Sequence, residues 1–325
     1  MQVDRLAGWV PVRIYWEQDE AFLDWCYVGE QRFTDPFFGD TIEKCLRNPA
    51  NLLFRRQTPV ETLTARRDAC PGLLPKGFIF HMSRCGSTLV AQLLASLPQA
   101  IVISEAGPID AVLRANFRDP TLTDERRAAW LQAVVSALGQ PRTGQEKDLF
   151  IKFDCWDTMD LGLINRAFPG VPWIFLYRNP VEVMVSQSRR KSAHLVPGVI
   201  EPALFGLDEG AALTFQPEEY CAIILARICE AALRHHKPGR SMIIDYNRLP
   251  EAVWTSVLDF FGADYTHDDL ERLNHAAQFY SKNPSLHFQD DRAAKNRLAS
   301  EQLIQVTERW LAPVYEQLKA AELAS

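Results

Sequence analysis

The stretch from Lys76 to Val90, KGFIFHMSRCGSTLV, contains the features that decide the fold. An apolar strand candidate, Phe78–Phe80, leads into a short polar loop, and an apolar helix is expected to begin near Ser87. Such a loop points backbone N–H groups at one place, and the partial positive charge of the helix N-terminus favours an anion there. The segment therefore predicts a binding site for phosphate or sulfate at the end of a strand.

The side chains of the loop suit this role. Gly86 permits close approach of the backbone to an anion, and Arg84 offers a fixed cationic fork. Ser87 and Thr88 can cap the helix and donate to phosphate oxygens. The alternative interpretation is an ordinary turn capped by Ser87, with Arg84 in solvent. We also assign to the anion site the two remaining loop residues, Ser83 and Cys85.

The loop is not a Walker A motif, which requires Gly, four residues and then Gly–Lys–Ser/Thr. His81 occupies the first Gly position, and Ser87 occupies the Lys position. The sequence therefore disfavours a nucleoside triphosphate held with magnesium.

Four further apolar runs follow between helical patterns, and their continuity is typical of strands covered on both faces. They are Ile101–Ile103, Leu149–Phe153, Trp173–Tyr177 and Met242–Tyr246. Helices are predicted over Ser87–Leu97, Asp124–Leu138, Val181–Arg190, Glu218–His235, Pro250–Phe261 and residues 293–323, the last kinked or divided by Pro313. This alternation predicts an α/β fold with a parallel central sheet of about five strands flanked by helices.

Residues 1–75 differ in composition and pattern: Trp and Phe residues lie among charged residues, and no long helical period is present. Phe33–Phe38 indicates a turn with apolar anchors, and Pro71–Lys76 indicates a linker. We expect a small N-terminal cap of mixed structure over residues 1–75 and one α/β domain over residues 76–325.

Composition limits the functional classes. The chain has 325 residues, 47% of them hydrophobic, and a formal net charge of −6, which argues against a general nucleic-acid binder. No apolar stretch is long enough for a transmembrane helix, and the first residues do not resemble a signal peptide. Seven cysteines without CxxC spacing suggest neither a disulfide framework nor a zinc knuckle. We expect a cytoplasmic location, and a homodimer stays open.

A second anion site is indicated by Trp173–Ser186, WIFLYRNPVEVMVS. Arg178 follows an apolar strand, at the edge where ligands of open α/β sheets bind. Pro180 suits the first turn of a helix, and Ser186 lies two turns further on. A surface Arg and a helix-face Ser are the alternative.

Together, the two segments resemble the sulfotransferases that use 3′-phosphoadenosine 5′-phosphosulfate (PAPS). Arg84–Thr88 is similar to the family's 5′-phosphosulfate loop, with Cys85 where Ser is usual. Arg178 and Ser186 match the spacing of its 3′-phosphate motif, and Ile243–Pro250 resembles a later family strand. The resemblance covers about residues 77–290. It implies a P-loop-type sulfotransferase fold, PAPS as donor, 3′,5′-ADP as product and no metal.

The resemblance also suggests catalytic residues. Arg84 is the candidate that stabilises charge on the leaving nucleotide, and Lys152 matches the Lys of the family's Lys–x–His strand end. Asp154 replaces that His and is one candidate base, whereas Glu105, after the second strand, is the other and slightly favoured. A solvent-exposed Lys152, a structural Asp154 and a helix-terminal Glu105 are the alternatives. His81 and His194 are weaker candidates for the base.

The residues expected to contact the cofactor near the C-terminal end of the chain match the family pattern poorly. Lys282 is the nearest equivalent of its basic Arg–Lys–Gly loop, and Lys295 or Arg297 is an alternative. The acceptor is a small molecule, glycan or peptide, which the N-terminal cap and Ala193–Glu209 are expected to enclose. Two other functions stay open: a P-loop kinase, and a non-catalytic scaffold that keeps the nucleotide site.

Overall fold

The computed structural model describes residues 6–189, 191–192, 195–280, 283–287 and 299–324. Its centre is a parallel five-stranded sheet in the order β5-β6-β4-β7-β8. Each predicted apolar run forms one strand, so the α/β prediction is confirmed. The strands are β4 (Pro75–His81), β5 (Ala100–Ser104), β6 (Asp148–Lys152), β7 (Trp173–Tyr177) and β8 (Ser241–Asp245).

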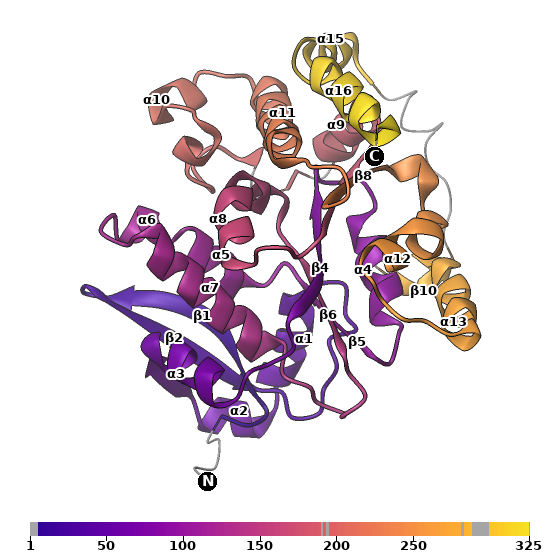
Figure 1. Cartoon of the computed structure of the whole chain (residues 1–325). Coiled ribbons are helices and arrows are strands. Elements are labelled where there is room, and N and C mark those ends of the chain that lie inside the picture. Colours follow the sequence, from indigo (N-terminus) through magenta and orange to yellow (C-terminus); the bar gives the residue numbers. More distant parts are fainter. Residues whose placement is uncertain (1–5, 190, 193–194, 281–282, 288–298, 325) are drawn as a thin grey trace.

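Helices cover both faces of this sheet, which explains why its strands are continuously apolar. In Figure 1, α7, α8 and α11 lie on one side, and α4, α12 and α13 lie on the other. The longer helices are α4 (Ser87–Ala95), α7 (Asp124–Leu138), α9 (Pro180–Arg189), α11 (Pro217–His235) and α13 (His267–Ala277). Shorter ones are α5 (Gly107–Leu113), α6 (Ala115–Arg118), α8 (Leu161–Ala167), α10 (Glu209–Ala212), α12 (Leu258–Phe260) and the 3₁₀ segments Cys155–Asp160, Pro202–Phe205 and Tyr246–Arg248.

The N-terminal part forms a three-stranded antiparallel sheet in the order β1-β2-β3, beside which lie three helices. These elements are β1 (Trp9–Glu17), β2 (Glu20–Tyr27), β3 (Arg56–Pro59), α1 (Phe38–Leu46), α2 (Pro49–Leu53) and α3 (Glu61–Ala69). Strand β1 packs on α5, and α3 packs on α7. Buried residues of both parts belong to one continuous core. The division at residue 75 into two units stays a prediction.

In the C-terminal part, one predicted helical stretch agrees with the structure and another differs from it. The last helical stretch is divided at Leu311 into α15 (Glu301–Trp310) and α16 (Ala312–Leu323), with Pro313 in the first turn of α16. Pro250–Phe261 is not one continuous α-helix, because Val253–Val257 is a π-helical turn that precedes α12. A short hairpin of β9 (Phe279–Tyr280) and β10 (Asn283–His287) follows.

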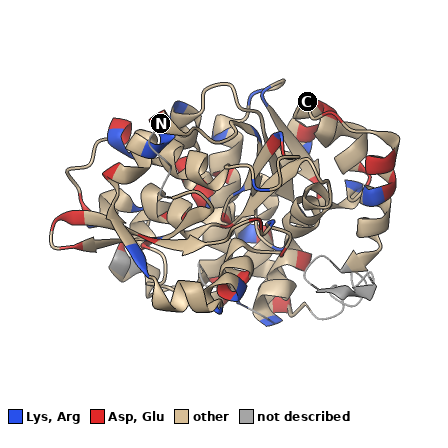
Figure 2. Ribbon diagram, turned by 90° about the horizontal axis from the view of Figure 1, so that it is seen from below, with Lys and Arg blue, Asp and Glu red and all other residues tan. Residues whose placement is uncertain are grey.

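Charged residues of both signs occur in many of these elements. Figure 2, which views the ribbon from below, shows Lys and Arg interspersed with Asp and Glu. Among the described residues, every helix is too short or too polar to cross a bilayer.

Candidate active site

The loop between β4 and α4 has an unusual backbone. Ser83, Arg84 and Gly86 have left-handed φ values of 76°, 52° and 84°. Alternation of such conformations with right-handed ones creates concavities lined by backbone N–H groups. Gly86, not Ser87, is the N-cap of α4, and it offers no side-chain cap. The predicted capping by Ser87 is therefore wrong, and the first turn of α4 is not capped by a side chain.

The side chains of two loop residues hold the loop to the sheet and to α9. The Cys85 thiol donates to the carbonyl oxygen of Leu176, with 3.0 Å between the two atoms, and burial raises the pKa of Cys85 to about 12. The hydroxyl of Ser83 accepts from Nε2 of Gln187 at 2.9 Å. Both side chains are thus engaged within the protein, and Gln187 is a contact that the sequence did not reveal.

Arg178 lies at the end of β7, the strand adjacent to β4. Its Nε donates to Oε2 of Glu182 at 2.6 Å, and its Nη2 lies 2.5 Å from the same oxygen in an ion pair. Its guanidinium carbon lies 4.0 Å from the ring centroid of Tyr246, which follows β8. Only 6% of Arg178 is exposed, so the alternative of a surface arginine is wrong. The spacing of Arg178 and Glu182, four residues apart at a helix start, would have predicted their pairing.

Tyr246 brings the two predicted anion sites together. A side-chain Cβ at Gly86 would lie 2.8 Å from the Tyr246 ring, the same ring that Arg178 covers. The backbone N–H of Arg178 also donates to the sulfur of Met82, in the loop after β4, at 3.3 Å. The carboxyl ends of β4, β7 and β8 therefore place the phosphate loop and Arg178 at one edge of the sheet, the edge at which open α/β sheets generally bind ligands.

Glu105 and Lys152 form a buried pair after the adjacent strands β5 and β6. The Lys152 ammonium donates to Oε1 of Glu105, and the Lys152 side chain has no exposed surface, so the solvent-exposed alternative is wrong. Glu105 has a left-handed φ of 54°, and its N–H donates to the carbonyl of Lys152 at 2.8 Å. Burial raises the pKa of Glu105, but the Lys152 charge and contacts with His81 outweigh it and hold the pKa well below its usual range.

The pKa of Asp154 is shifted in the direction opposite to that of Glu105. Burial, followed by the charges of Glu105 and Asp110, raises the pKa of Asp154 well above its usual range. Asp154 and Asp157 form a reciprocal capping box around the 3₁₀ turn that begins at Cys155. One carboxyl beside Lys152 is thus kept ionised while its neighbour is pushed toward the protonated form, a separation typical of acid and base pairs in enzymes.

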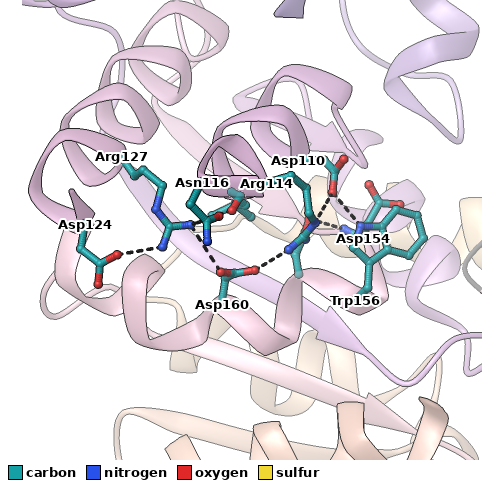
Figure 3. Close-up of polar contacts among 10 residues, drawn as sticks. Asp110, Arg114, Asn116, Asp124, Arg127, Asp154, Trp156 and Asp160 are labelled. Atoms are coloured by element: carbon teal, nitrogen blue, oxygen red, sulfur yellow. Dashed lines mark hydrogen bonds and ion pairs between the residues drawn. The ribbon is translucent and has the colours of Figure 1, made fainter. Parts of the chain in front are cut away.

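A polar network supports this edge of the site (Figure 3). Asp110 accepts from the indole N–H of Trp156 at 2.7 Å and pairs with Nε of Arg114 at 3.3 Å. Arg114 also donates to Asp157 and Asp160, at 2.6 Å each. The network therefore fixes the turn that carries Asp154.

The N-terminal part contributes a side chain as well. Nζ of Lys152 lies 5.2 Å from the ring centroid of Phe37, a half-buried residue just before α1. Phe33 and Phe38 anchor this turn by stacking, with centroids 5.3 Å apart. The sequence predicted the anchors but not the contact, because 115 positions separate Phe37 from Lys152.

The remaining predicted residues are less defined. Ser186 is half-buried on α9, next to Gln187, and Thr88 is buried in the first turn of α4. Lys282, His194, Lys295 and Arg297 lie outside the described residues, as do residues 193–194 of the predicted Ala193–Glu209 loop.

Several solved structures are similar to this chain. A sulfotransferase from Alicyclobacillus acidocaldarius is 16% identical, over 77% of this chain and 96% of that one, with a TM-score of 0.45. The sulfotransferase domain of the curacin biosynthetic pathway is 19% identical, over 78% and 98%, with a TM-score of 0.41. Mouse SULT7A1 complexed with PAP is 10% identical, over 82% and 94%, with a TM-score of 0.40.

No curated protein matches the chain. The model of the sulfotransferase family, however, matches residues 75–269, which is more than half of the sequence. The match spans β4, the phosphate loop, the strands that carry Glu105, Lys152 and Arg178, and β8. The chain therefore belongs to the sulfotransferase family.

Proposed function

We propose that this protein transfers the sulfuryl group of PAPS to a hydroxyl or amine of a small-molecule, glycan or peptide acceptor. The observation that carries the proposal is the convergence of Gly86 and Arg178 on the ring of Tyr246. Two anion sites at one edge of the sheet suit the two phosphorylated ends of one adenosine nucleotide. The family match supports the same donor chemistry.

The residues fit the 5′ end of such a nucleotide. The close packing of Gly86 against the Tyr246 ring leaves no room for a side chain, and the loop has the left-handed φ values of an anion-binding concavity. Helix α4 directs its N-terminus at the loop and has no side-chain cap there. Arg84, half-buried, with Ser87 and Thr88, would hold the 5′-phosphosulfate.

The 3′-phosphate would be held by Arg178 and Ser186. Glu182 and the Tyr246 ring fix the guanidinium of Arg178 in one orientation, which lowers the entropy lost on binding. Lys282 is a further candidate for this phosphate from the resemblance alone.

Bound PAPS would supply an activated sulfuryl group whose departure leaves negative charge on the nucleotide. Arg84 stabilises that charge by hydrogen bonding, because an arginine does not give up its proton. Lys152 adds a second positive charge from the buried end of β6. Both residues act more strongly on the transition state than on the ground state, which lowers the barrier.

Glu105 is the residue we assign as general base for the acceptor proton. Its pKa is low while Lys152 is paired with it, so it is ionised but weakly basic. Attraction of Lys152 toward an anionic donor removes the charge that lowers this pKa, and burial then raises it. Donor binding thereby makes Glu105 a stronger base. The raised pKa of Asp154 favours its protonated form, which cannot accept the acceptor proton.

Calorimetry with 3′,5′-ADP, and with ATP or GTP plus Mg²⁺, tests the donor site. We expect 3′,5′-ADP to bind and the triphosphates not to bind. Release of 3′,5′-ADP from PAPS in the presence of a panel of alcohols, phenols, amines and glycans then reports turnover. Preference for ATP with Mg²⁺ would support a kinase, and 3′,5′-ADP binding without turnover of any acceptor would support the scaffold.

The variants E105Q and D154N separate the two carboxyls. We expect E105Q to keep its affinity for 3′,5′-ADP and to lose turnover by about 10²-fold or more, as for removal of a general base. D154N, the matched control, should lose less. A turnover in E105Q equal to that of the parent would contradict the assignment.

A further inference from the structure

The inference concerns His81, the last residue of β4, which the mechanism above does not use. His81 is buried, with 6% of its surface exposed. Its Nδ1 accepts the backbone N–H of Ser83 at 3.1 Å. Burial, reinforced by the Lys152 charge, lowers the pKa of His81 even though Glu105 raises it. A neutral imidazole whose Nδ1 accepts a hydrogen bond carries its proton on Nε2.

That Nε2–H points toward Glu105 without a close acceptor. Oε1 of Glu105 lies 3.5 Å from Nε2, at the outer limit of a hydrogen bond. Within the described ranges, no group meets hydrogen-bond geometry with this nitrogen. A buried N–H donor without a hydrogen-bond acceptor lowers the stability of the fold, so its presence here calls for an explanation. The backbone of Phe153 is the other hydrogen-bonding group near the ring.

The pairing of Glu105 explains the long contact. The same Oε1 that faces His81 accepts from the Lys152 ammonium, which holds the carboxylate. If Lys152 moves toward a bound sulfuryl donor, Glu105 loses this partner and would be a buried carboxylate without a donor. His81 supplies a donor that is already placed, because β4 and its contact with Ser83 fix the ring. Catalytic hydrogen bonds commonly tighten in this way when the substrate binds.

We propose that His81 is a positioning residue. Its Nε2–H donates a hydrogen bond to the Glu105 carboxylate when the Lys152 ammonium moves from Glu105 to the sulfuryl donor. The exchange keeps the base at a fixed place while its positive partner leaves. This inference rests on the proposed roles of Glu105 and Lys152. Neutral His81 does not add a charge that would weaken the base, which a protonated imidazole would do.

Imidazole NMR of the ¹⁵N-histidine-labelled full chain tests the exchange without any acceptor. The signals of His81 are assigned by their loss in H81Q. We expect a neutral ring with the proton on Nε2. In K152M, which removes the ammonium and leaves an unbranched apolar side chain one atom shorter, the Nε2 proton should move downfield as the hydrogen bond to Glu105 shortens. The double variant K152M/E105Q should abolish this shift.

Addition of PAPS to the parent protein gives a second measurement that does not depend on the stability of K152M. The Nε2 proton should move in the same direction as in K152M. An unchanged Nε2 proton in both experiments, or a shift that persists in K152M/E105Q, would mean that the ring donates to the Phe153 backbone and would overturn the proposal. Absence of PAPS binding with a positive K152M result would instead refute the proposed donor.

A conservative rescue distinguishes positioning from a merely structural role. Gln can place an N–H near the position of Nε2, whereas Leu cannot. Carboxyl NMR should therefore show a pKa of Glu105 about 1 higher in K152M/H81L than in K152M/H81Q, as for loss of one hydrogen bond to a charged group. H236Q is the matched control, because His236 bonds Ser241 at the opposite end of β8. Equal values in the two double variants would contradict the proposal.

Discussion

Gly86 is the residue at which the phosphate loop touches the end of β8. Its φ of 84° is left-handed, and a Cβ there would meet Tyr246 and Leu249 at 2.8 Å. We expect G86A to lower the free energy of unfolding by about 1–3 kcal/mol, from backbone strain and overpacking. It should also weaken binding of 3′,5′-ADP, because the Tyr246 ring must shift from beneath Arg178. Urea unfolding and calorimetry measure the two effects.

The matched control is G39A, on α1, where an added Cβ meets nothing within 4 Å. G39A should leave nucleotide affinity unchanged. Parent-like affinity in G86A would mean that the loop does not form the binding surface.

Arg178 is the residue that most directly tests the 3′-phosphate site. Removing the guanidinium deletes charge-assisted hydrogen bonds, so R178A should weaken 3′,5′-ADP binding by about 2 kcal/mol in calorimetry. R166A, on α8 and paired with Asp124 and Glu125, is the control and should bind like the parent. Unchanged affinity in R178A would refute the site.

Arg84 should behave differently from Arg178. If it stabilises the leaving group, R84A lowers turnover more than it lowers nucleotide affinity, by about 10²-fold or more in kcat. Steady-state kinetics with PAPS, together with calorimetry of 3′,5′-ADP, give the two quantities. The reverse pattern, with affinity lost and kcat kept, would assign Arg84 to ground-state binding alone.

The stability of the turn after β6 depends on Arg114, which lies in the short connection between α5 and α6 (Figure 3). Three carboxylates contact its guanidinium: those of Asp110, Asp157 and Asp160. We expect R114M to lower the free energy of unfolding by about 3–5 kcal/mol near neutral pH, because breaking a buried ion pair leaves uncompensated charge. R118M, on the exposed end of α6, should change it little.

The pH dependence of this effect has a definite sign. Burial raises the folded-state pKa of Asp157 and Asp160, and loss of Arg114 raises it further. A carboxyl with a raised folded-state pKa binds more protons in the folded state, so its contribution to stability falls as pH rises above the unfolded value. R114M should therefore lose less stability at pH 5 than at pH 8. A loss that is larger at pH 5 would contradict this account.

The elements also show why some of the fold was predictable. Strands β4 to β8 are buried on both faces, so each leaves a continuous apolar run that the sequence displays. The β1–β2 hairpin was not predicted, because its two-residue turn after Glu17 uses Gln18 at a φ of 54°, where Asn or Gly is the usual signal. The π-helical turn at Val253–Val257 has no marker in the residue pattern.

The sequence predicted candidate residues one by one, but it did not predict which of them lie in contact. Glu105 and Lys152 were each recognised as candidates, yet their pairing depends on β5 lying beside β6, an order that periodicity does not reveal. The roles of Tyr246 and Phe37 were missed for the same reason, because each reaches the site from a distant segment. Local residue patterns predict where each strand ends. The order of the strands in the sheet decides which of these ends lie side by side, and local patterns do not predict that order.

The family match begins at residue 75, but residues before it also pack against the α/β part. Strand β1 covers α5, α3 covers α7, and Nη2 of Arg32 donates to the carbonyls of Leu97 and Ala95, at the end of α4, at 2.7 and 3.2 Å. Phe37 lies over Lys152. The N-terminal part is thus continuous with the core and with the candidate site.

We therefore expect residues 75–325 alone to lack cooperative unfolding, because removal of β1 and α3 exposes buried faces of α5 and α7. Thermal denaturation followed by circular dichroism measures this. R32M in the full chain is the graded control: it deletes charged hydrogen bonds to the end of α4 and should cost about 2 kcal/mol while unfolding stays cooperative. If residues 75–325 unfolded cooperatively at the temperature of the full chain, the N-terminal part would be a separate unit and its contact with Lys152 would not be needed for the fold.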